Sequence, residues 1–484
     1  MATICTSNVT SGFIDLATFD ELEKYMYGGP DATAYFVRET RKSTWFTQVP
    51  VCLSKASGNA GFDTEWSVSI SRAGDYLLSA WLRLTTPTVT PNAAVFAADP
   101  DLRIRWTRNF MHNLIRECNI TFNDLVAARF DNYHLDFWAA FTVPSGKQGG
   151  YNNMIGNFDE LTAPHGNVPA GGGPVTNIPA FTLNLPLPLF FARDSGVALP
   201  TAALPYNDMR INFSFRDWRE LLVVTKIEAA FPSVNLLTNN NIPVNDTHVA
   251  NASTMVLSNV QVWANYAIVS NDERKRMACA PRDILIEQVQ TAPRQAFAPA
   301  TNPNPRYDIR FSHAIKVLFF SVRNQTTKGE WSNYTAGSPT VLSTTIDHSA
   351  PAMTDPILQT SLIYENTNRL AQMGSDYFSL VNPWYHAPVI PLETGYHSYS
   401  YSLDFICLDP MGSTNYGKLT NVSIVPEASQ DAVNAATAAG ATALVATNTA
   451  LQGASFNQNY EFIVTAVNNN IIRISGGALG FPVL

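Results

Sequence analysis

The stretch SNDERKRMACAPRD, residues 270–283, places three acidic and four basic side chains in a chain of which only 14% of residues are charged. Asn271 can cap a helix whose first turn holds acids and whose later turn holds bases, the charge order that a helix dipole favours. Pro281 would end that helix, because proline lacks a backbone N–H and its ring blocks the preceding turn. Strand-like sequences lie on both sides, at 261–269 and 284–291. We interpret residues 270–283 as a charged helical link between two halves.

Segments of the first half recur in the second half in the same order. Four strand-like segments return at an offset of about 240 residues, and three more return at about 210. The offset shortens because the first half carries a larger glycine-rich loop at 144–183. Ordered self-similarity of this kind indicates an internal repeat. The matched pairs are 45–51 with 284–291, 66–70 with 307–311, 76–84 with 315–323, 120–124 with 362–366, 185–192 with 398–405, 206–215 with 418–425, and 261–269 with 461–474.

The repeat predicts an all-β fold of two tandem, eight-stranded, antiparallel jelly rolls with long loops. An immunoglobulin-like sandwich would be smaller, near 100 residues, and the absence of strand–helix alternation disfavours a parallel sheet. Long insertions are expected before the last strand of each half, at 225–254 and 426–458. The predicted parts are a helical N-terminal arm at 1–30 with its helix at 19–26, jelly roll 1 at 31–271, a charged linker at 272–283, and jelly roll 2 at 284–484.

The composition agrees with two β-rich cores. A length of 484 residues exceeds one ordinary core, and 46% hydrophobic residues can fill two. Five cysteines without any CxxC spacing argue against a disulfide framework and indicate a reducing compartment. The first residues do not resemble a signal peptide, and no run of about 18 apolar residues could span a membrane. The net charge of −8 disfavours general nucleic-acid binding.

Three short motifs suggest chemistry, but each has a better structural explanation. Residues 412–419, GSTNYGKL, nearly match a phosphate-binding loop, yet Leu419 stands where serine or threonine would hold magnesium, and a strand is predicted next. Asp159 and Glu160 are sequence neighbours that tend to point apart, so we expect solvated acids. Residues 194–196 are interpreted as a turn, because no nucleophile-elbow motif surrounds Ser195.

Bases and aromatic residues are interleaved in RIRWTRNF, residues 103–110, a pattern that can bind single-stranded nucleic acid. In an acidic chain we expect instead an amphipathic strand with exposed arginines. The eight histidines are never close enough in sequence to predict a metal site, and His386 and His397 are expected at the surface or core edge. The sequence therefore predicts no catalytic, cofactor-binding or metal-binding residues, no cofactor and no enzyme.

Motifs along nearly the whole chain are typical of one protein family. They are 10–18 (TSGFIDLAT), 26–29 (MYGG), 71–76 (SRAGDY), 111–115 (MHNLI), 151–156 (YNNMIG), 193–200 (RDSGVALP), 287–293 (EQVQTAP), 409–421 (DPMGSTNYGKLTN) and 470–484 (NIIRISGGALGFPVL). Through these motifs the chain resembles the iridovirus major capsid proteins, which are double jelly-roll capsid proteins of nucleocytoplasmic large DNA viruses, and those of invertebrate iridescent viruses in particular.

This resemblance implies a homotrimer whose six barrels form a pseudo-hexagonal capsomer. Such capsomers tile an icosahedral shell outside an internal membrane, with assembly in the host cytoplasm. The implied partners are neighbouring capsomers, and minor capsid proteins and inner membrane proteins on the inner face, without direct nucleic-acid contact. The linker at 272–283 would then fix the angle between the barrels.

Two further expectations concern the loops. The B–C, D–E, F–G and H–I loops of a jelly roll gather at one end, and here the D–E and H–I loops, and the F–G loop of the first half, are long. We expect this end to face outward, where it could meet a host receptor, with the arm at 1–30 on the inner side. The alternative function is a carbohydrate-binding or hydrolysing β-sandwich, because aromatic residues in loops can stack on sugars. Those aromatic residues are Trp331, Tyr334, Trp384 and Tyr385.

Overall fold

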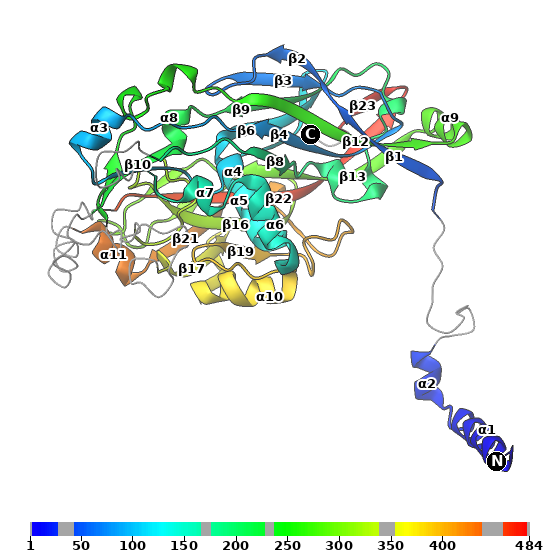
Figure 1. Cartoon of the computed structure of the whole chain (residues 1–484). Coiled ribbons are helices and arrows are strands. Elements are labelled where there is room, and N and C mark those ends of the chain that lie inside the picture. The colour runs from blue at the N-terminus through cyan, green and yellow to red at the C-terminus, as the bar shows by residue number, and fades with distance from the viewer. Residues whose placement is uncertain are drawn as a thin grey trace. The chain divides into compact units, whose positions relative to one another are not determined.

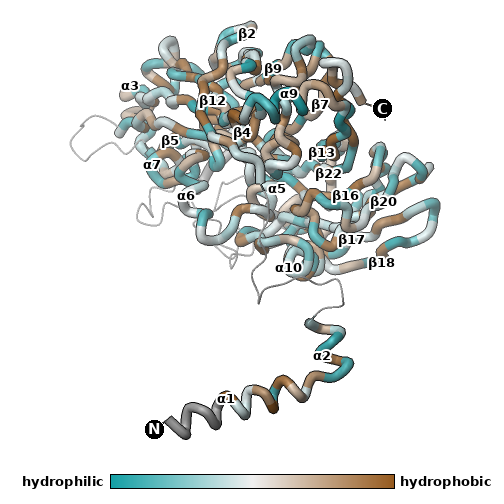
Figure 2. Tube along the Cα trace, turned by 90° about the vertical axis from the view of Figure 1, so that its right-hand side faces the viewer, coloured by the Kyte–Doolittle hydropathy of each residue, from teal (hydrophilic) through white to brown (hydrophobic). Residues whose placement is uncertain are grey.

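The computed structural model describes residues 2–27, 43–165, 176–227, 237–337, 354–437 and 458–481. Its contacts separate Met1–Trp45 from a compact body, Phe46–Leu484. The first unit contains helices α1 (Ala2–Ala17) and α2 (Glu21–Met26). The predicted helix at 19–26 is present as α2, where Asp20 and Glu23 form a capping box. Helix α1 was not predicted; its apolar side chains, including Phe13 and Leu16, are exposed, and Figure 2 shows hydrophobic (brown) segments along its trace.

The first half of the body is a sandwich of two antiparallel sheets. Lettered B to I in chain order, its strands have the sheet orders B-I-D-G and C-H-E-F, with one short extra strand beside C. The first sheet contains β1 (Phe46–Cys52), β12 (Ser258–Val269), β4 (Tyr76–Thr85) and β8 (Thr182–Pro186). The second contains β2 (Ser54–Gly58), β3 (Glu65–Ser69), β9 (Met209–Phe215), β6 (Ile115–Phe122) and β7 (Leu125–Phe130).

The second half repeats both strand orders, B-I-D-G and C-H-E-F. Its first sheet contains β13 (Arg282–Thr291), β22 (Tyr460–Ser475), β16 (Ala314–Asn324) and β19 (His397–Ser400), extended by β14 (Gln295–Phe297), β20 (Thr414–Asn415) and β23 (Ala478–Gly480). Its second sheet contains β15 (Tyr307–Asp308), β21 (Val422–Ala428), β17 (Ile357–Tyr364) and β18 (Thr367–Gly374). All seven sequence matches pair equivalent strands, so the repeat and the jelly-roll prediction are confirmed.

The sequence comparison missed strand F of each half, β7 and β18. Each follows a two-residue turn in which both residues have positive φ: Asn123 and Asp124 at 48° and 64°, and Glu365 and Asn366 at 46° and 64°. Turns of this kind match the twist of hairpin strands. The matched segments 120–124 and 362–366 end on these equivalent turns, so the repeat extends to the hairpin geometry.

Insertions extend the first half. The D–E and H–I connections supply a third sheet of β5 (Leu102–Trp106), β10 (Leu222–Ile227) and β11 (Leu237–Ile242). Figure 1 shows α3, β10 and α11 toward one end of the body and α9 at the other. Much of the predicted insertion at 426–458 lies outside the described residues. The helices of the body's loops are α3 (Ala93–Ala98), α4 (Phe110–Leu114), α5 (Asn132–Thr142), α6 (Ser145–Ile155), α7 (Asp159–Thr162), α8 (Trp218–Leu221), α10 (Asn382–His386) and α11 (Gln430–Ala436).

The predicted link is helix α9 (Asn271–Cys279). Its N-cap is Ser270, so the prediction of Asn271 was wrong by one residue; Asn271 is the first helical residue, and its side chain accepts a hydrogen bond from Arg274. Arg274 also pairs with Asp75 of the first half, with Nε 2.6 Å from a carboxylate oxygen, and Met277 is buried in the first core. The helix is therefore fastened to the first jelly roll.

Each sandwich has its own core, but the two halves share residues. Trp66 and Leu82 lie in the first core, and Phe320 and Phe462 in the second. Strands β13 and β22 continue beyond the second sandwich, because Ile284 and Ile472 belong to the first core. Among the described helices, none is long and apolar enough to cross a membrane.

Candidate functional site

Helix α5 forms a buried seam between the two jelly rolls. Asp131 caps the helix by accepting a hydrogen bond from the backbone N–H of His134 at 3.0 Å. Tyr133, Phe137 and Phe141 follow at intervals of four, so they lie on one face of the helix. None of the three side chains is exposed. A helix of the first half therefore presents an aromatic face that requires a partner.

The partner of this aromatic face is a sheet of the second half. Phe319 of β16 stacks on Phe137 and Phe141, with ring centroids 5.8 and 5.4 Å apart. Val317 and Phe319 of β16 join this seam, whereas Leu318 and Phe320 point into the second core. The sheet is thus covered on both faces, which explains why IKVLFFSVR is almost continuously apolar instead of alternating.

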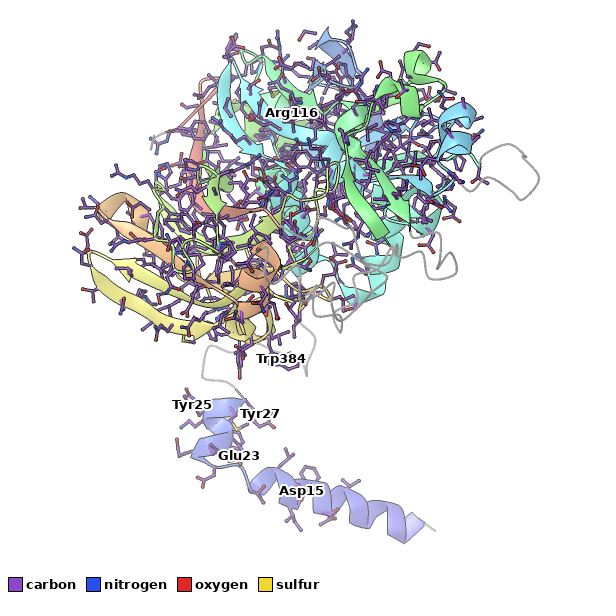
Figure 3. All side chains as sticks on the ribbon, turned by 90° about the vertical axis from the view of Figure 1, so that its left-hand side faces the viewer. Asp15, Glu23, Tyr25, Tyr27, Arg116 and Trp384 are labelled. Carbon is purple, nitrogen blue, oxygen red and sulfur yellow. The ribbon has the colours of Figure 1, made fainter. Side chains whose placement is uncertain are left out.

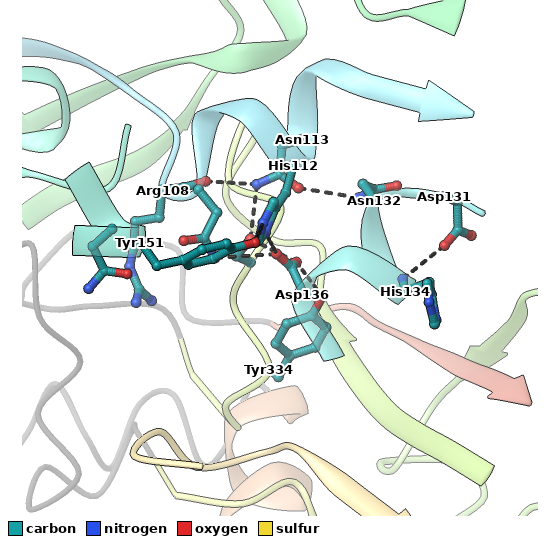
Figure 4. A network of polar contacts seen from close by, with 12 residues as sticks. Arg108, His112, Asn113, Asp131, Asn132, His134, Asp136, Tyr151 and Tyr334 are labelled. Atoms are coloured by element: carbon teal, nitrogen blue, oxygen red, sulfur yellow. Dashed lines mark hydrogen bonds and ion pairs between the residues drawn. The ribbon is translucent and has the colours of Figure 1, made fainter. Parts of the chain in front are cut away.

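The buried carboxylate of Asp136 joins the halves beside this apolar contact (Figure 4). Asp136 of α5 accepts hydrogen bonds from Ser332 Oγ at 2.9 Å and Tyr334 OH at 2.8 Å, both from the second half. It also bonds His112 Nδ1 at 2.8 Å, and His112 Nε2 lies 2.6 Å from Tyr151 OH. Burial raises the pKa of Tyr334 well above its ordinary value, and Asp136 acts in the same direction, so the phenol remains a donor.

The arginines of residues 103–110 form a second polar contact between the two halves, and the prediction that they are exposed was wrong. Arg103, Arg105 and Arg108 are only 5–7% exposed. Strand β5 belongs to the inserted third sheet and is covered, so it has no solvent face. Arg105 Nη2 lies 3.5 Å from Glu330, and Arg108 pairs with Glu393, so both arginines contact the second half. Burial opposes the charge of Arg108, but Glu393 raises its pKa above the ordinary value.

Glu287 of β13 provides a third polar contact between the two halves. Its carboxylate lies 2.5 Å from both Lys316 Nζ and Arg193 Nη1, and Arg193 comes from the first half. The Arg193 guanidinium also lies over the Trp138 ring of α5, 4.2 Å from its centroid. Removing one member of a buried charge group leaves the others unpaired, which typically costs about 3–5 kcal/mol. The seam thus combines apolar packing with buried charges that are paired across the halves.

The other residues singled out in the sequence do not converge on one site. Residues 412–419 lead through β20 and one 3-10 turn (Tyr416–Lys418) into β21 rather than into an α-helix, and Asp159 and Glu160 are exposed. His397 was expected at the surface or core edge, but it is fully buried, stacks on Phe320 and lies 2.7 Å from Asp355. Within the part of the chain that the structure describes, no group of three or more His, Cys, Asp or Glu side chains could hold a metal ion.

Two of the four aromatic residues behind the carbohydrate alternative are not exposed. Tyr334 is buried in the seam, and Trp331 is half-buried beneath the guanidinium groups of Arg216 and Arg323. Trp384 and Tyr385 are exposed by 70% and 73%, and Trp384 projects from the body in Figure 3. They continue an apolar helical face with Leu380 and Val381, four residues earlier, which we call the 380–385 face.

Two tandem jelly rolls, joined by a buried seam, define a double jelly-roll protein. Family models match both halves: "Major capsid protein N-terminus" covers residues 34–269, and "Large eukaryotic DNA virus major capsid protein" covers residues 273–480. The chain belongs to this family of viral major capsid proteins, and it is accordingly a structural component of the virion.

Relatives with the same description extend over nearly the full chain. The chain is 65% identical to the major capsid protein of Costelytra zealandica iridescent virus, over 99% of both chains. It is 63% identical to that of Invertebrate iridescent virus 6, over 99% of this chain and all of the relative. It is 47% identical to that of Lymphocystis disease virus 1, over all of both chains. The resemblance predicted from the motifs is confirmed.

Solved structures show the same fold at low identity. A PBCV-1 virus capsid chain matches with a TM-score of 0.68 and 18% identity, over 93% of this chain and all of the other. The Faustovirus major capsid protein matches with a TM-score of 0.65 and 11% identity, over 95% of each chain. The predicted double jelly roll is therefore confirmed, and the carbohydrate alternative has no support in these comparisons.

Proposed function

We propose that this chain forms homotrimers that act as pseudo-hexagonal capsomers of an icosahedral shell. The observation that carries the proposal is the seam, which joins two equivalent jelly rolls into one compact body. Three copies around a threefold axis would present six similar barrels, and this approximates a hexagonal outline. In this role the protein is a building block and not an enzyme.

The 380–385 face is our proposed contact between subunits of the trimer. Its four apolar side chains lie on one helical surface and are exposed by 42–73%. An obligate interface is expected to cover such a surface, since the cores of these interfaces are apolar and depleted of charge. The remaining partners that we propose are neighbouring capsomers, minor capsid proteins and inner membrane proteins on the inner face, and a host receptor at the outer loops, with assembly in the host cytoplasm.

The trimer is tested by changing two side chains of this face. Trp384→Asp with Tyr385→Asp should convert a species of three times 53.1 kDa into monomers, because two charges would have to be desolvated at the contact. Light scattering coupled to size-exclusion chromatography gives the mass. Val256→Asp, which changes an exposed apolar residue of the first half, is the control and should leave the trimer intact. A wild-type monomer at high concentration would contradict the trimer, and a trimeric double variant would contradict this interface.

The predicted parts, 1–30, 31–271, 272–283 and 284–484, remain our proposed division of the chain. Its support is that every described strand pairs within its own half: strands from Phe46 to Val269 pair only with one another, and so do strands from Arg282 to Gly480. Electron microscopy of purified material would test the assembly itself, with hexagonal lattices as the expected result.

A further inference from the structure

A groove of about 690 Å³ lies between the two halves and is not used by the seam contacts described above. One wall is β7 of the first half with the neighbouring residues Arg116 and Glu117 of β6. The other wall contains residues 288–294, which include the end of β13, and residues 310–313, which connect β15 to β16. We call it the basic groove, because four arginines line it: Arg116, Arg129, Arg294 and Arg310.

The charge of the basic groove contrasts with the net charge of −8 of the whole chain. Only two acidic residues, Glu117 and Asp131, line it. Arg129 and Arg310 are exposed, and no ion pair within the described part of the chain engages either of them. Arg116, labelled in Figure 3, is held only loosely, with Nη2 3.6 Å from Asp63 and 3.8 Å from Glu220. The groove therefore offers guanidinium groups that can bind carboxylates.

Both walls also contain the edge strand of a sheet. Strand β7 ends the order β2-β3-β9-β6-β7, and β13 begins the order β13-β22-β16-β19, so no described strand pairs with their outer edges. The carbonyl of Ala127 in β7 faces this gap and is already occupied, since it accepts a hydrogen bond from Gln288 Nε2 at 2.7 Å; a peptide would pair with the other outward groups of β7. An open strand edge can bind an extended peptide through backbone hydrogen bonds. Val126, an apolar residue of β7, is also 38% exposed at the groove.

We propose that the basic groove binds an extended acidic segment of a partner protein, whose backbone pairs with the edge of β7 and whose carboxylates bind Arg129 and Arg310. A peptide fits better than a single-stranded nucleic acid for two reasons. A strand edge is satisfied by a polypeptide backbone, and sequence-tolerant nucleic-acid sites stack bases on accessible aromatic rings. The aromatic residues that line this groove, Phe130 and Phe311, are buried.

The test uses the full-length protein and a labelled ten-residue peptide that alternates glutamate with threonine. Fluorescence anisotropy at low salt should show binding to the wild type. The double variant Arg129→Glu with Arg310→Glu should bind at least about tenfold more weakly, because it replaces two attractions with two repulsions. The matched control is Lys275→Glu with Arg276→Glu, which makes the same charge change on exposed α9 and should leave the affinity unchanged.

Three further measurements separate the contribution of the carboxylates to binding from that of backbone pairing. The same peptide with glutamine in place of glutamate should bind weakly, and a backbone N-methylated version should also bind weakly, because it cannot pair with a strand edge. Hydrogen exchange should slow at residues 125–130 when the acidic peptide is bound. Equal affinity of the groove variant and the wild type would overturn the proposal. So would a peptide that fails to bind, or an oligothymidylate of the same charge that binds more tightly than the peptide.

Discussion

At the scale of single residues, the halves are joined by side chains that are costly to bury unless they are paired. Asp136 is fully buried, and its hydrogen bonds include Ser332 and Tyr334, which approach from the other half. A buried carboxylate without such partners would cost several kcal/mol. The need to satisfy Asp136 therefore favours one relative placement of α5 and the D–E connection of the second half.

His134 gives a pH dependence at this same seam. Burial lowers its pKa to about 3, and the charge of Arg193 acts in the same direction. Below pH 6.5 the unfolded chain binds a proton that the folded chain does not, so stability falls as the pH decreases from 6.5 toward 3. Between pH 7 and pH 5, His134→Leu should lose up to about 2 kcal/mol less unfolding free energy than the wild type. Denaturant unfolding at both pH values measures this difference, and identical losses would contradict the prediction.

At the scale of elements, α5 and not α9 makes the larger contact between the halves. Helix α9 is fastened to the first jelly roll through Arg274 and Met277, whereas α5 packs Phe137 and Phe141 against a sheet of the second. The expectation that the linker at 272–283 fixes the angle between the barrels remains untested. The packing of α5 favours the seam as the element that holds the angle.

Two changes compare these elements. Phe137→Ala should cost about 3–5 kcal/mol of unfolding free energy, because it opens a cavity in the seam. Four glycines inserted after Ala280 should leave the hexagonal lattices seen by electron microscopy intact, because the seam still holds the barrels. Phe13→Ala, at a site that is 67% exposed on α1, is the control and should change stability by less than about 0.5 kcal/mol. Loss of lattices on glycine insertion would instead show that the linker holds the angle between the two barrels.

At the scale of the whole molecule, the body has two different ends. The D–E and H–I insertions, with α3, β10 and α11, lie toward one end, and α9 lies at the opposite end (Figure 1). Strand β1 starts beside α9, since Phe46 pairs with Val269 immediately before that helix. We therefore propose that the insertions face the outside of a shell.

Limited proteolysis of intact particles tests this orientation. Cleavage should occur first within 426–458, because an outward loop is open to protease while the shell shields its inner side. The arm at 1–30 should be cut later. Mass spectrometry of the fragments locates the cuts, and dissociated protein, which has no shell to shield either region, is the control. Earlier cleavage within 1–30 would reverse the assignment.

Much of the fold was predictable because it depends on local patterns and on the repeat. Alternation in 65–70 identified a strand with one buried face, and the polarity of Asp272 to Arg276 identified a short helix. Strand F was missed in both halves, although Asn123 and Asp124 stand at the turn that begins it. The sequence also contains two signals of the seam: the spacing of Tyr133 and Phe137, and the non-alternating run at 315–323.

The sequence by itself determined seven of the eight strands of each jelly roll, the duplication and the family, because period, turn chemistry and motif are properties of neighbouring residues. Only the tertiary structure decided which surfaces meet. Phe137 and Phe319 are 182 positions apart, and no local pattern states that their faces will stack. Arg105 and Arg108 look like solvent-facing bases in the sequence, yet they are buried because Glu330 and Glu393 of the other half approach them. A charge can be buried only where a distant partner compensates it, and that partner is fixed by the fold.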